Sequence, residues 1–386
     1  MKEDWVVKKL GDVCTIERGG SPRPINAYLT DSADGINWIK IGDASEGSKY
    51  ITSTKERIKP EGVKKSRMVH KGDFILSNSM SFGRPYILNI DGCIHDGWLV
   101  IHDKNNVFDK SYLYYYLGSP NIYREFQRLA VGGVVNNLNS ELVRNVQVAI
   151  PPLPEQSRIV EELDQLSNII EKKRQQLSEL DNLAQSIFYD MFILKNEQWE
   201  RMPLIDIYKF IDYRGKTPNK IDYGVPLITA RNIRKGYIDY TVKEFISETE
   251  FQSRQSRGIA QKGDLLFTTE APMGYAAIAD LDTFSTGQRL ITFQQRNEGV
   301  VSNIYVLYYI LSDMFQTELN KQATGATVKG IKGSKLEKMI VPLPPFNLQQ
   351  LFAQKIEAIE KEKELIKQSI KETEELFNSR MDYYFG

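Results

Sequence analysis

The amino-acid sequence predicts an α+β fold with an internal duplication, in which two globular α/β domains accompany two long helices that pair as a coiled coil. Three observations support this prediction. Two proline-rich stretches are each followed by apolar residues at alternating spacings of four and three, which is the pattern of a coiled-coil seam. The second stretch lies 193 residues after the first, half of the 386-residue chain. Short motifs that precede the first stretch recur in the same order between the two stretches, so the duplication covers the whole chain.

The first long helix is predicted to begin within Pro151-Pro152-Leu153-Pro154. Pro154 suits a first helical position, and Glu155 places a negative charge in the first turn, where the helix dipole favours it. Lys173 is the polar interruption of the seam that follows. The apolar seam residues are Ile159, Leu163, Leu166, Ile170, Leu177, Leu180, Ala184, Ile187 and Met191.

The second long helix is predicted to follow Pro344-Pro345-Phe346. Lys363 and Thr373 interrupt its seam, so Lys173 and Lys363 fall in different layers of the predicted coiled coil. At about 1.5 Å per residue, a helix of roughly 35 residues would be about 50 Å long. A helix so long and so narrowly apolar needs a partner, and the nearest candidate is the other copy. Its seam residues are Phe352, Ile356, Ile359, Ile366, Ile370 and Phe377.

Length and composition limit the class of protein. A hydrophobic content of 41% in 386 residues permits two domains with their own cores. Fifty basic and fifty acidic residues give a formal net charge of zero, so any basic surface must be local. The chain has two cysteines, and no segment resembles a signal peptide or is apolar for long enough to cross a membrane. These features predict a reduced, cytoplasmic protein without membrane association.

The two halves repeat one order of motifs. Lys71-Gly72-Asp73 and Lys262-Gly263-Asp264 are turns that each lead into an apolar strand. Leu113–Leu117 and 307–311 both predict a buried, tyrosine-rich helix. We therefore expect one domain over residues 1–153 and a second over 195–346, with helical segments over 154–194 and 347–386.

The loops between these shared motifs carry different polar residues in the two halves, which predicts two sites of one kind that read different targets. The alternative, that loops merely vary faster than cores, has equal weight for any single loop. Arg pairs with guanine, Asn or Gln with adenine and Glu with cytosine, while Lys and Ser mostly hold phosphates. The candidate DNA-contacting residues are Ser21, Arg23, Asn26, Asn78, Ser79, Arg84, His95, Asn136 and Asn137 in the first half, and Arg214, Lys216, Lys220, Arg231, Arg234, Glu270, Tyr275, Gln288, Arg289 and Lys329 in the second.

Neither of two cofactor-binding motifs is complete. An adenine methyltransferase needs Asn or Asp before its Pro-Pro pair, to hold the amino nitrogen of a flipped base, but Ile150 and Leu343 stand there. The glycines from Gly325 to Gly330 have the spacing of a phosphate-binding loop, yet Ile331 occupies the position of the required lysine. The sequence therefore predicts neither a methyltransferase centre nor a nucleotide cradle.

Metal-dependent chemistry is not predicted either. Glu171-Lys172-Lys173 has the Glu-x-Lys spacing of many nucleases, but it lies on the predicted long helix, where charges more often form a solvated flank. His70, His95, His102 and the two cysteines do not have the spacing of metal ligands. These residues therefore form no catalytic constellation, and the polar loops are compatible with DNA binding without establishing it.

The chain resembles the specificity subunits of type I restriction-modification enzymes. The resemblance is carried by Pro151-Pro152-Leu153-Pro154-Glu155-Gln156-Ser157-Arg158-Ile159-Val160 and by its second copy, Pro342-Leu343-Pro344-Pro345-Phe346-Asn347-Leu348-Gln349-Gln350, each of which opens a long helix. The Lys-Gly-Asp turns, the loop from Thr324 to Gly330 and the half-length duplication agree with it. The second helix entry departs from the pattern, because Leu348-Gln349 replaces Glu155-Gln156.

The resemblance implies two target recognition domains, separated by two antiparallel helices and related by a pseudo-twofold axis. Each domain would read one half of a split site in double-stranded DNA, and the helices would set the length of the spacer between the halves. Two methyltransferase subunits, which use S-adenosylmethionine to methylate adenine, and restriction subunits that use ATP and Mg²⁺ would assemble on this non-catalytic chain in phage defence.

Two alternatives from other classes remain. An enzyme that modifies DNA by itself would have to bind S-adenosylmethionine or a metal without the motifs that such binding requires. A scaffold or decoy specificity subunit would keep the fold but would not read DNA. Its DNA binding would depend on salt and show no sequence preference, since phosphate contacts alone do not discriminate between bases.

Overall fold

The computed structural model describes residues 5–45, 47–78, 83–130, 138–194, 198–215, 217–325 and 328–386. The chain divides into two compact units. Unit 1 comprises Met1–Arg174 and Gln368–Gly386, and unit 2 comprises Gln175–Lys367. Each unit thus contains one globular part and a segment of each long helix. The division of the chain at 153, 194 and 346 into domains and spacers stays a prediction.

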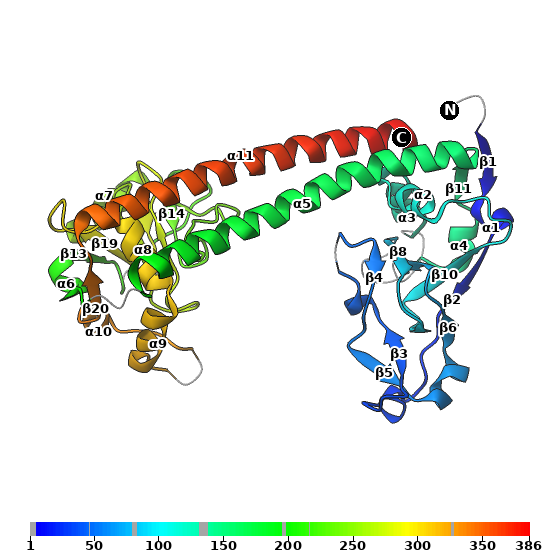
Figure 1. The fold of residues 1–386 in the computed structure, drawn as a ribbon, viewed down its shortest axis with the longest axis horizontal. Coiled ribbons are helices and arrows are strands. Elements are labelled where there is room, and N and C mark those ends of the chain that lie inside the picture. The colour runs from blue at the N-terminus through cyan, green and yellow to red at the C-terminus, as the bar shows by residue number, and fades with distance from the viewer. Residues whose placement is uncertain are drawn as a thin grey trace. The chain divides into compact units, whose positions relative to one another are not determined.

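The described residues of unit 1 form three sheets with helices beside them (Figure 1). The largest sheet has the strand order β2 (Cys14–Arg18), β10 (Trp98–Asp103), β7 (Phe74–Ser77), β8 (Pro85–Leu88), β4 (Tyr50–Ile51). A second has the order β5 (Glu56–Ile58), β3 (Ile36–Ile39), β9 (Gly92–Ile94), β6 (Arg67–Val69), and β1 (Val6–Lys9) pairs with β11 (Gln147–Ile150). The helices are α1 (Leu10–Val13), α2 (Lys110–Leu117), α3 (Pro120–Ala130) and α4 (Ser140–Arg144), with 3-10 turns at Ile25–Ala27, Ile41–Asp43 and Pro60–Lys65.

The described residues of unit 2 repeat this plan with one strand fewer in each of the two larger sheets. That sheet has the order β13 (Tyr208–Asp212), β19 (Leu290–Gln295), β16 (Leu265–Thr268), β17 (Ala276–Ile278). The smaller sheets are β15 (Phe245–Ile246), β14 (Val225–Ile228), β18 (Ser285–Thr286), and β12 (Glu200–Pro203) with β20 (Ile340–Leu343). The helices are α6 (Leu204–Ile207), α7 (Glu248–Arg254), α8 (Asn303–Leu311), α9 (Asp313–Gln322) and α10 (Gly333–Leu336), with a 3-10 turn at Gln255–Arg257.

Hydrogen bonds confirm the internal duplication. Tyr112 on α2 donates its hydroxyl proton to Ala149 O (2.9 Å), and Tyr305 on α8 donates to Pro342 O (2.7 Å). Both tyrosines are fully buried, so each hydroxyl needs a partner inside the protein. Donor and acceptor are shifted by the same number of residues from one unit to the other, and the predicted tyrosine-rich helices are both present.

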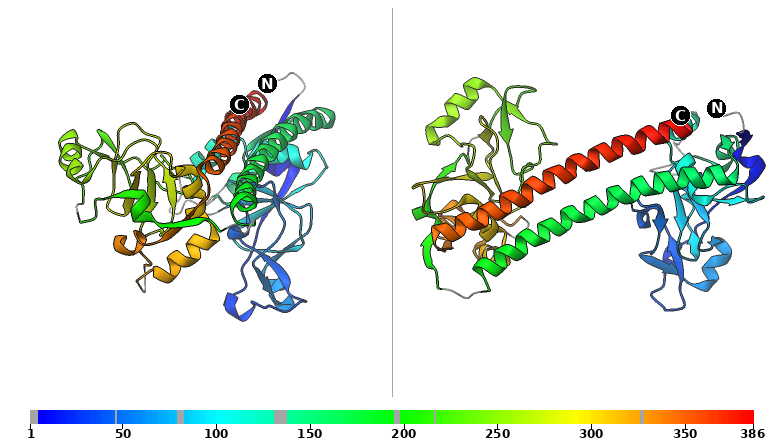
Figure 2. Two further views of the ribbon diagram at one scale, coloured as in Figure 1. Left: turned by 60° about the vertical axis from the view of Figure 1, so that its left-hand side comes forward. Right: turned by 45° about the horizontal axis from the view of Figure 1, so that its top comes forward.

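The long helices α5 (Leu153–Phe192) and α11 (Phe346–Phe385) are 40 residues each, and within each unit their segments lie side by side (Figures 1 and 2). In unit 1, Arg380 donates to Glu162 (Nη2 to Oε2, 3.0 Å). In unit 2, Phe188 packs on Phe352 with ring centroids 5.7 Å apart. A residue early in α5 thus contacts a residue late in α11, and a residue late in α5 contacts one early in α11. The helix segments therefore pair antiparallel within each unit.

Two half-buried lysine layers interrupt the apolar seam, one in each unit. Lys173 Nζ donates to Ser369 Oγ (2.5 Å) and Thr373 Oγ1 (3.3 Å) in unit 1. Lys363 Nζ lies 2.7 Å from carboxylate oxygens of both Asp181 and Glu360 in unit 2. Because a polar group at a seam position must meet its own partners, these layers fix the register of the helix pair.

The predicted seam residues occupy two environments. Some are fully buried in the core of their unit, whereas the others are half-buried. The buried residues are Ile159 and Leu163 in unit 1 and Phe352, Ile356 and Ile359 in unit 2; the half-buried residues are Leu166, Ile170, Ile370 and Phe377 in unit 1 and Leu177, Leu180, Ile187 and Ile366 in unit 2.

Several aromatic residues outside the predicted seam are buried as well. Phe188 and Phe192 on α5 belong to the core of unit 2, and Tyr384 and Phe385 on α11 to that of unit 1. The observed apolar face is wider than the predicted seam of two residues per heptad, because each helix end contacts a globular core in addition to the other helix.

One carboxyl in unit 2 is buried at a cost in stability. Asp264 is 7% exposed, and burial raises its pKa to about 6, although Gln261 N (2.8 Å) and Gln294 donate to it and act in the opposite direction. A carboxyl whose folded-state pKa is above its unfolded value favours folding fully at low pH, and this contribution is lost as pH rises through about 6.

We expect Asp264→Asn to stabilise unit 2 at pH 8 by about 1–3 kcal/mol, because the amide cannot ionise yet still accepts from Gln261. The gain should shrink toward pH 4, where the wild-type carboxyl is protonated. Thermal melting between pH 4 and 8 measures it. Asp282→Asn is the control, because the Asp282 side chain is 85% exposed and should change stability little. A gain that did not depend on pH would contradict this account.

Candidate nucleic-acid interface

A hollow of about 700 Å³ on unit 1 contains four of the predicted DNA-contacting residues: Ser21, Arg23, Asn26 and His95. The first three come from the loop and 3-10 turn that follow β2, and His95 follows β9. The buried Trp38 of β3 also lines the hollow. Gly19 makes this assembly possible, because a Cβ there would lie 2.3 Å from His95 O. The structure thus brings together residues that are about 75 positions apart in the chain.

Asp96 lies at the centre of these residues. Ser21 Oγ donates to its Oδ1 (2.8 Å), and Arg18 Nε donates to its backbone oxygen (2.9 Å). Its Oδ2 is 3.9 Å from Nη2 of Arg23, whose side chain is 83% exposed. Burial acts to raise the pKa of Asp96, but the Ser21 hydrogen bond and the nearby His95 and Arg18 together lower the pKa by a larger amount. The net shift is therefore downward. The hollow therefore holds an ionised carboxylate at neutral pH.

His95 is held in a neutral form that can donate one hydrogen bond. Its Nδ1 accepts from Gly97 N (2.9 Å), which leaves the proton of the neutral ring on Nε2. That Nε2 lies 3.5 Å from Asp96 Oδ1. Burial is the largest influence on His95 and lowers its pKa, while the Asp96 charge acts in the opposite direction.

Asn78 is buried behind the same turn, with 2% of its surface exposed. Its Nδ2 donates to Asp96 O (3.1 Å), so in this structure the side chain supports the turn. Its Oδ1 has no hydrogen-bond partner among the described residues. Arg84 is half-buried on the far side of β7, and its backbone nitrogen donates to Ser77 Oγ (2.9 Å). The predicted Ser79, Asn136 and Asn137 lie outside the described residues.

The loops of unit 2 bring a different set together. Arg289 Nε pairs with Glu270 Oε1 (3.0 Å), and Thr217 Oγ1 donates to Gln288 Oε1 (3.1 Å). Glu270 forms an isolated β-bridge with Gly330, which follows the exposed Lys329. Four predicted residues from three loops, namely Glu270, Gln288, Arg289 and Lys329, are therefore neighbours. Lys216 lies outside the described residues.

Arg214 is held by its own loop. Its Nε donates to Asp212 Oδ2 (2.8 Å), and this hydrogen bond raises the pKa of Arg214 above its usual value. The side chain is 37% exposed. Tyr275 is half-buried beside Lys235, whose Nζ lies 5.7 Å from the ring centroid. These two predicted residues lie near the loop cluster but already have partners within the unit.

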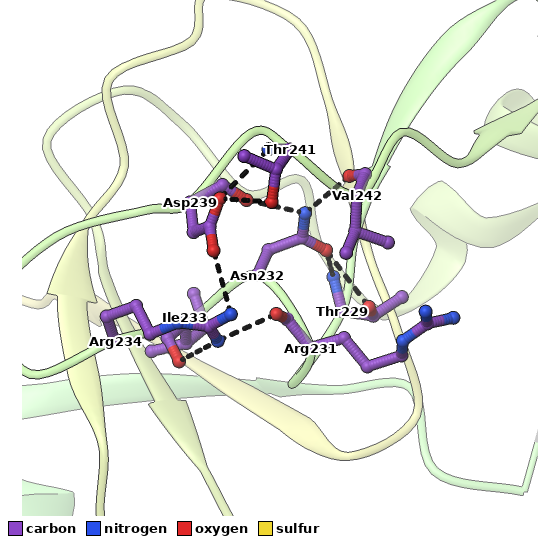
Figure 3. Close-up of polar contacts among 8 residues, drawn as sticks. All are labelled: Thr229, Arg231, Asn232, Ile233, Arg234, Asp239, Thr241 and Val242. Carbon is purple, nitrogen blue, oxygen red and sulfur yellow. Dashed lines mark hydrogen bonds and ion pairs between the residues drawn. The ribbon is translucent and has the colours of Figure 1, made fainter. Parts of the chain in front are cut away.

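The loop from Thr229 to Val242 is organised by a buried asparagine (Figure 3). Asn232, 1% exposed, accepts from Thr229 N (3.0 Å) and Thr229 Oγ1 (3.0 Å) and donates to Asp239 O (2.9 Å) and Val242 O (2.8 Å). Arg234 Nη2 pairs with Asp239 Oδ2 (2.7 Å). All hydrogen-bonding capacity of Asn232 is thus used to fix the shape of the loop.

Arg231 of this loop and the nearby Lys220 present two basic groups at the surface. Arg231 and Lys220 both pair with Glu244 Oε1, at 3.2 and 2.8 Å, and are 68% and 50% exposed. One carboxylate cannot satisfy every donor of two cations, so both retain the capacity to bind a phosphate. The fixed loop therefore presents Arg231 at a defined position on the surface.

The family model for the type I restriction modification DNA specificity domain matches residues 2–182 and again 196–375. The chain belongs to this family. As in the structure, the match is double, and each copy includes one globular part and most of one long helix.

Relatives of this type I specificity chain align over nearly its full length. It is 22% identical to the specificity subunit of the type I restriction enzyme MjaVIII from Methanocaldococcus jannaschii, over 96% of this chain and 91% of that one. It is 21% identical to the EcoKI specificity subunit of Escherichia coli, over 93% and 82% of the two chains.

Solved structures of type I restriction-modification proteins share the fold. A chain from a type I system studied for complex assembly and conformational transition superposes with a TM-score of 0.64 at 19% identity, covering 100% of this chain and 98% of that one. The S subunit from M. genitalium gives a TM-score of 0.51 at 14% identity, covering 98% and 95%. Among the described residues of this specificity-family chain, no helix is long and apolar enough to span a membrane.

Residues that sequence reasoning missed complete both sites. Asp96 and Glu244 are the carboxylates on which the predicted cations converge, and Asn232 shapes the loop in unit 2. The repeat could have revealed Asn232, because Asp43 has the same place in the first half. In the structure, Asp43 accepts from Lys40 N (2.8 Å) as Asn232 accepts from Thr229 N. Asp96 was adjacent to a predicted residue, but nothing in the local sequence indicated its contact with Ser21.

Proposed function

We propose that this member of the type I specificity family is the DNA-reading subunit of a restriction-modification complex, in which each unit reads one half of a bipartite site. The main support is that the two units share buried contacts, such as those of Tyr112 and Tyr305, but carry different side chains on their loops. Unit 1 presents a hollow around Asp96, whereas unit 2 presents basic residues and Gln288. Matched frames with different polar groups suit two different base sequences.

The long helices set the spacer between the half-sites and bind two methyltransferase subunits. Apolar residues on their outer faces support this part of the proposal. Ile169 and Leu183 on α5 are 42% and 47% exposed, and Leu365 and Leu376 on α11 are 60% and 50% exposed. Exposed leucines at intervals along paired helices are suited to contact further helices of a partner.

The remaining components belong to the partners. The methyltransferase subunits would supply S-adenosylmethionine chemistry for adenine methylation, and restriction subunits would supply the ATP- and Mg²⁺-dependent steps. The chain itself contributes DNA reading and assembly and no catalytic group. In support, the loop positions described above are occupied by groups that pair with bases and phosphates, and most are engaged in hydrogen bonds that fix their orientation.

Single-molecule sequencing tests this proposal. DNA from cells that express the chain together with its methyltransferase subunit should contain N6-methyladenine in a split motif with a fixed spacer. If the subunits co-purify but no motif is methylated, the chain is a scaffold or decoy. Salt-dependent DNA binding without sequence preference would support that second outcome.

A heptad insertion tests the spacer role. We expect that seven residues added to both helices at the boundaries of the units, between Arg174 and Gln175 and between Lys367 and Gln368, will leave the contacts within each unit intact. Seven residues lengthen a helix by about 10 Å, or about three base pairs. The methylated motif should keep both half-sites, with a spacer about three base pairs longer, or methylation should be lost.

The control for this insertion replaces seven outward-facing residues of the same helices without changing their length, and its spacer should be that of the wild type. An insertion variant that methylated the motif with the original spacer would show that the helices do not set this distance.

A further inference from the structure

A four-residue turn follows the parallel strand pair β3 and β9 in unit 1. His95 N donates to Ile39 O (3.2 Å), at the end of β3, and Trp98 N closes the turn on His95 O (3.1 Å). Asn78 N donates to Gly97 O (2.9 Å) and holds the third residue of the turn. The second residue, Asp96, has its backbone fixed between these bonds.

Unit 2 contains the same turn after the parallel pair β14 and β18. Gly287 N donates to Ile228 O (2.7 Å), and Leu290 N closes the turn on Gly287 O (3.1 Å). Thr269 N donates to Arg289 O (3.0 Å), as Asn78 N does to Gly97 O in unit 1. Three backbone hydrogen bonds therefore agree between the units, and Gln288 occupies the position of Asp96.

This position is the point where a fixed frame presents a changed side chain. Asp96 has only acceptor oxygens when ionised, whereas Gln288 has one acceptor and two donors. Gln288 Oε1 already accepts from Thr217 Oγ1 (3.1 Å), and the side chain is half-buried. The two units thus differ in hydrogen-bonding character at a position that their backbones place in the same way.

Among the described residues, no side chain donates a hydrogen bond to Oδ2 of Asp96, so this oxygen is available for a ligand. Oδ1 of Asp96 is used by Ser21 Oγ at 2.8 Å and by His95 Nε2 at 3.5 Å, while Oδ2 is 3.9 Å from Arg23 Nη2, longer than a hydrogen bond. The Asp96 side chain is 36% exposed and lines the hollow of about 700 Å³. The carboxylate is therefore oriented by one oxygen and accessible through the other.

The chemistry of base edges selects among the possible ligands. A carboxylate repels phosphate, and the acceptor atoms of guanine and thymine give it no donor in the major groove. Adenine offers its N6 amino donor next to the N7 acceptor, which would face the second lone pairs of the carboxylate unfavourably. Cytosine offers the N4 amino group without an adjacent acceptor, and it is the base that aspartate and glutamate pair with.

We propose that Asp96 reads a cytosine in the half-site of unit 1, by accepting a hydrogen bond from the N4 amino group, and that the matched turn in unit 2 reads a different base through Gln288. This inference rests on the proposed function, because it assigns one base of the site that the complex recognises. Arg23 and His95 then act at the edges of the same contact as donors to neighbouring groups.

The experiment uses the complex of this chain with its methyltransferase subunits and maps N6-methyladenine for wild type, Asp96→Asn and Gln288→Glu. We expect Asp96→Asn to lose the requirement for cytosine at one position of one half-site, and to leave the other half-site and the spacer unchanged. Gln288→Glu should change only the other half-site. In each variant, retention of the half-site read by the unaltered unit shows that the variant is folded and assembled.

A chemical substitution tests the contact without altering the protein. A duplex in which 2-pyrimidinone, which lacks the 4-amino group, replaces the assigned cytosine should bind the wild-type complex about 10-fold or more weakly. Asp96→Ala should bind both duplexes equally, because the partner of the amino group is already absent.

Two results would overturn the inference while leaving the proposed function intact: an unchanged motif for Asp96→Asn, or full wild-type affinity for the 2-pyrimidinone duplex. A wild-type complex that methylates no motif would overturn the proposed function and the inference together.

Discussion

Replacing Gln156 by leucine is expected to lower the stability of unit 1 by about 3–5 kcal/mol, because three backbone groups, one in a buried residue and two in half-buried residues, would lose their hydrogen-bond partner. Gln156 is fully buried at the start of α5. Its Oε1 accepts from Asp109 N (2.7 Å), and its Nε2 donates to Val107 O (2.8 Å) and Pro151 O (2.9 Å). The side chain thereby ties the long helix to the loop that precedes α2.

Amide hydrogen exchange is the appropriate measurement, because a two-unit chain does not unfold as a single cooperative system. Protection should fall in α2 and β11 of unit 1 and stay unchanged in unit 2. Gln349→Leu supplies a mirror-image test, since Gln349 Oε1 accepts from Ser302 N (2.9 Å) and its Nε2 donates to Pro344 O (2.8 Å). That variant should lose protection in unit 2 alone.

The control is Gln165→Leu, because Gln165 is exposed on the same helix within unit 1, and it should change stability by less than about 0.5 kcal/mol. Equal effects of Gln165→Leu and Gln156→Leu would show that the hydrogen bonds of Gln156 contribute little. A loss spread evenly over both units after Gln156→Leu would show that the residue does not act locally.

The second large effect is expected for Phe188→Ala, which should destabilise unit 2 by about 3–5 kcal/mol, the usual cost of deleting a buried phenyl ring. Phe188 is 1% exposed. Its ring centroid lies 5.5 Å from that of Phe192, 5.7 Å from that of Phe352 and 6.0 Å from that of Tyr305. The cavity would open where α5, α11 and α8 meet.

Hydrogen exchange of α8 and of the adjoining parts of α5 and α11 measures this loss. Leu183→Ala, five residues earlier on α5 and 47% exposed, is the matched control and should cost little. Phe188→Leu should recover part of the stability by refilling the space. If Phe188→Ala and Leu183→Ala had similar effects, the aromatic cluster would not be what holds the helices to unit 2.

Both effects concern the attachment of the long helices to the globular parts, which the proposed function requires to be firm. If α5 and α11 set the spacing of two half-sites, weaker attachment of a helix to its globular part at Gln156 or Phe188 would make that spacing less uniform. Variants with these changes are therefore also informative in methylation maps, where a less uniform spacer is the expected secondary result.

The sequence by itself determined the helices and the duplication. The start of α5 at Leu153 and of α11 at Phe346 follows from the prolines beside them, and the heptad spacing of apolar residues lies within a few turns of helix. The tyrosine-rich helices and the Lys-Gly-Asp turns were likewise predictable. These signals are local in the chain, so they can be read without knowing which segments meet.

The contents of the candidate sites were decided by the tertiary structure. Asp96 meets Ser21, 75 residues earlier, only because β9 pairs with β3 in parallel and places its turn beside the loop after β2. Asn78, whose contact with DNA stays a prediction, is buried and donates to the backbone of that turn. The order of strands in a sheet depends on which pairings exclude the most apolar surface from water, and no short sequence pattern records that choice. The sequence predicted which loops are polar, but the fold determines which of their side chains face one another.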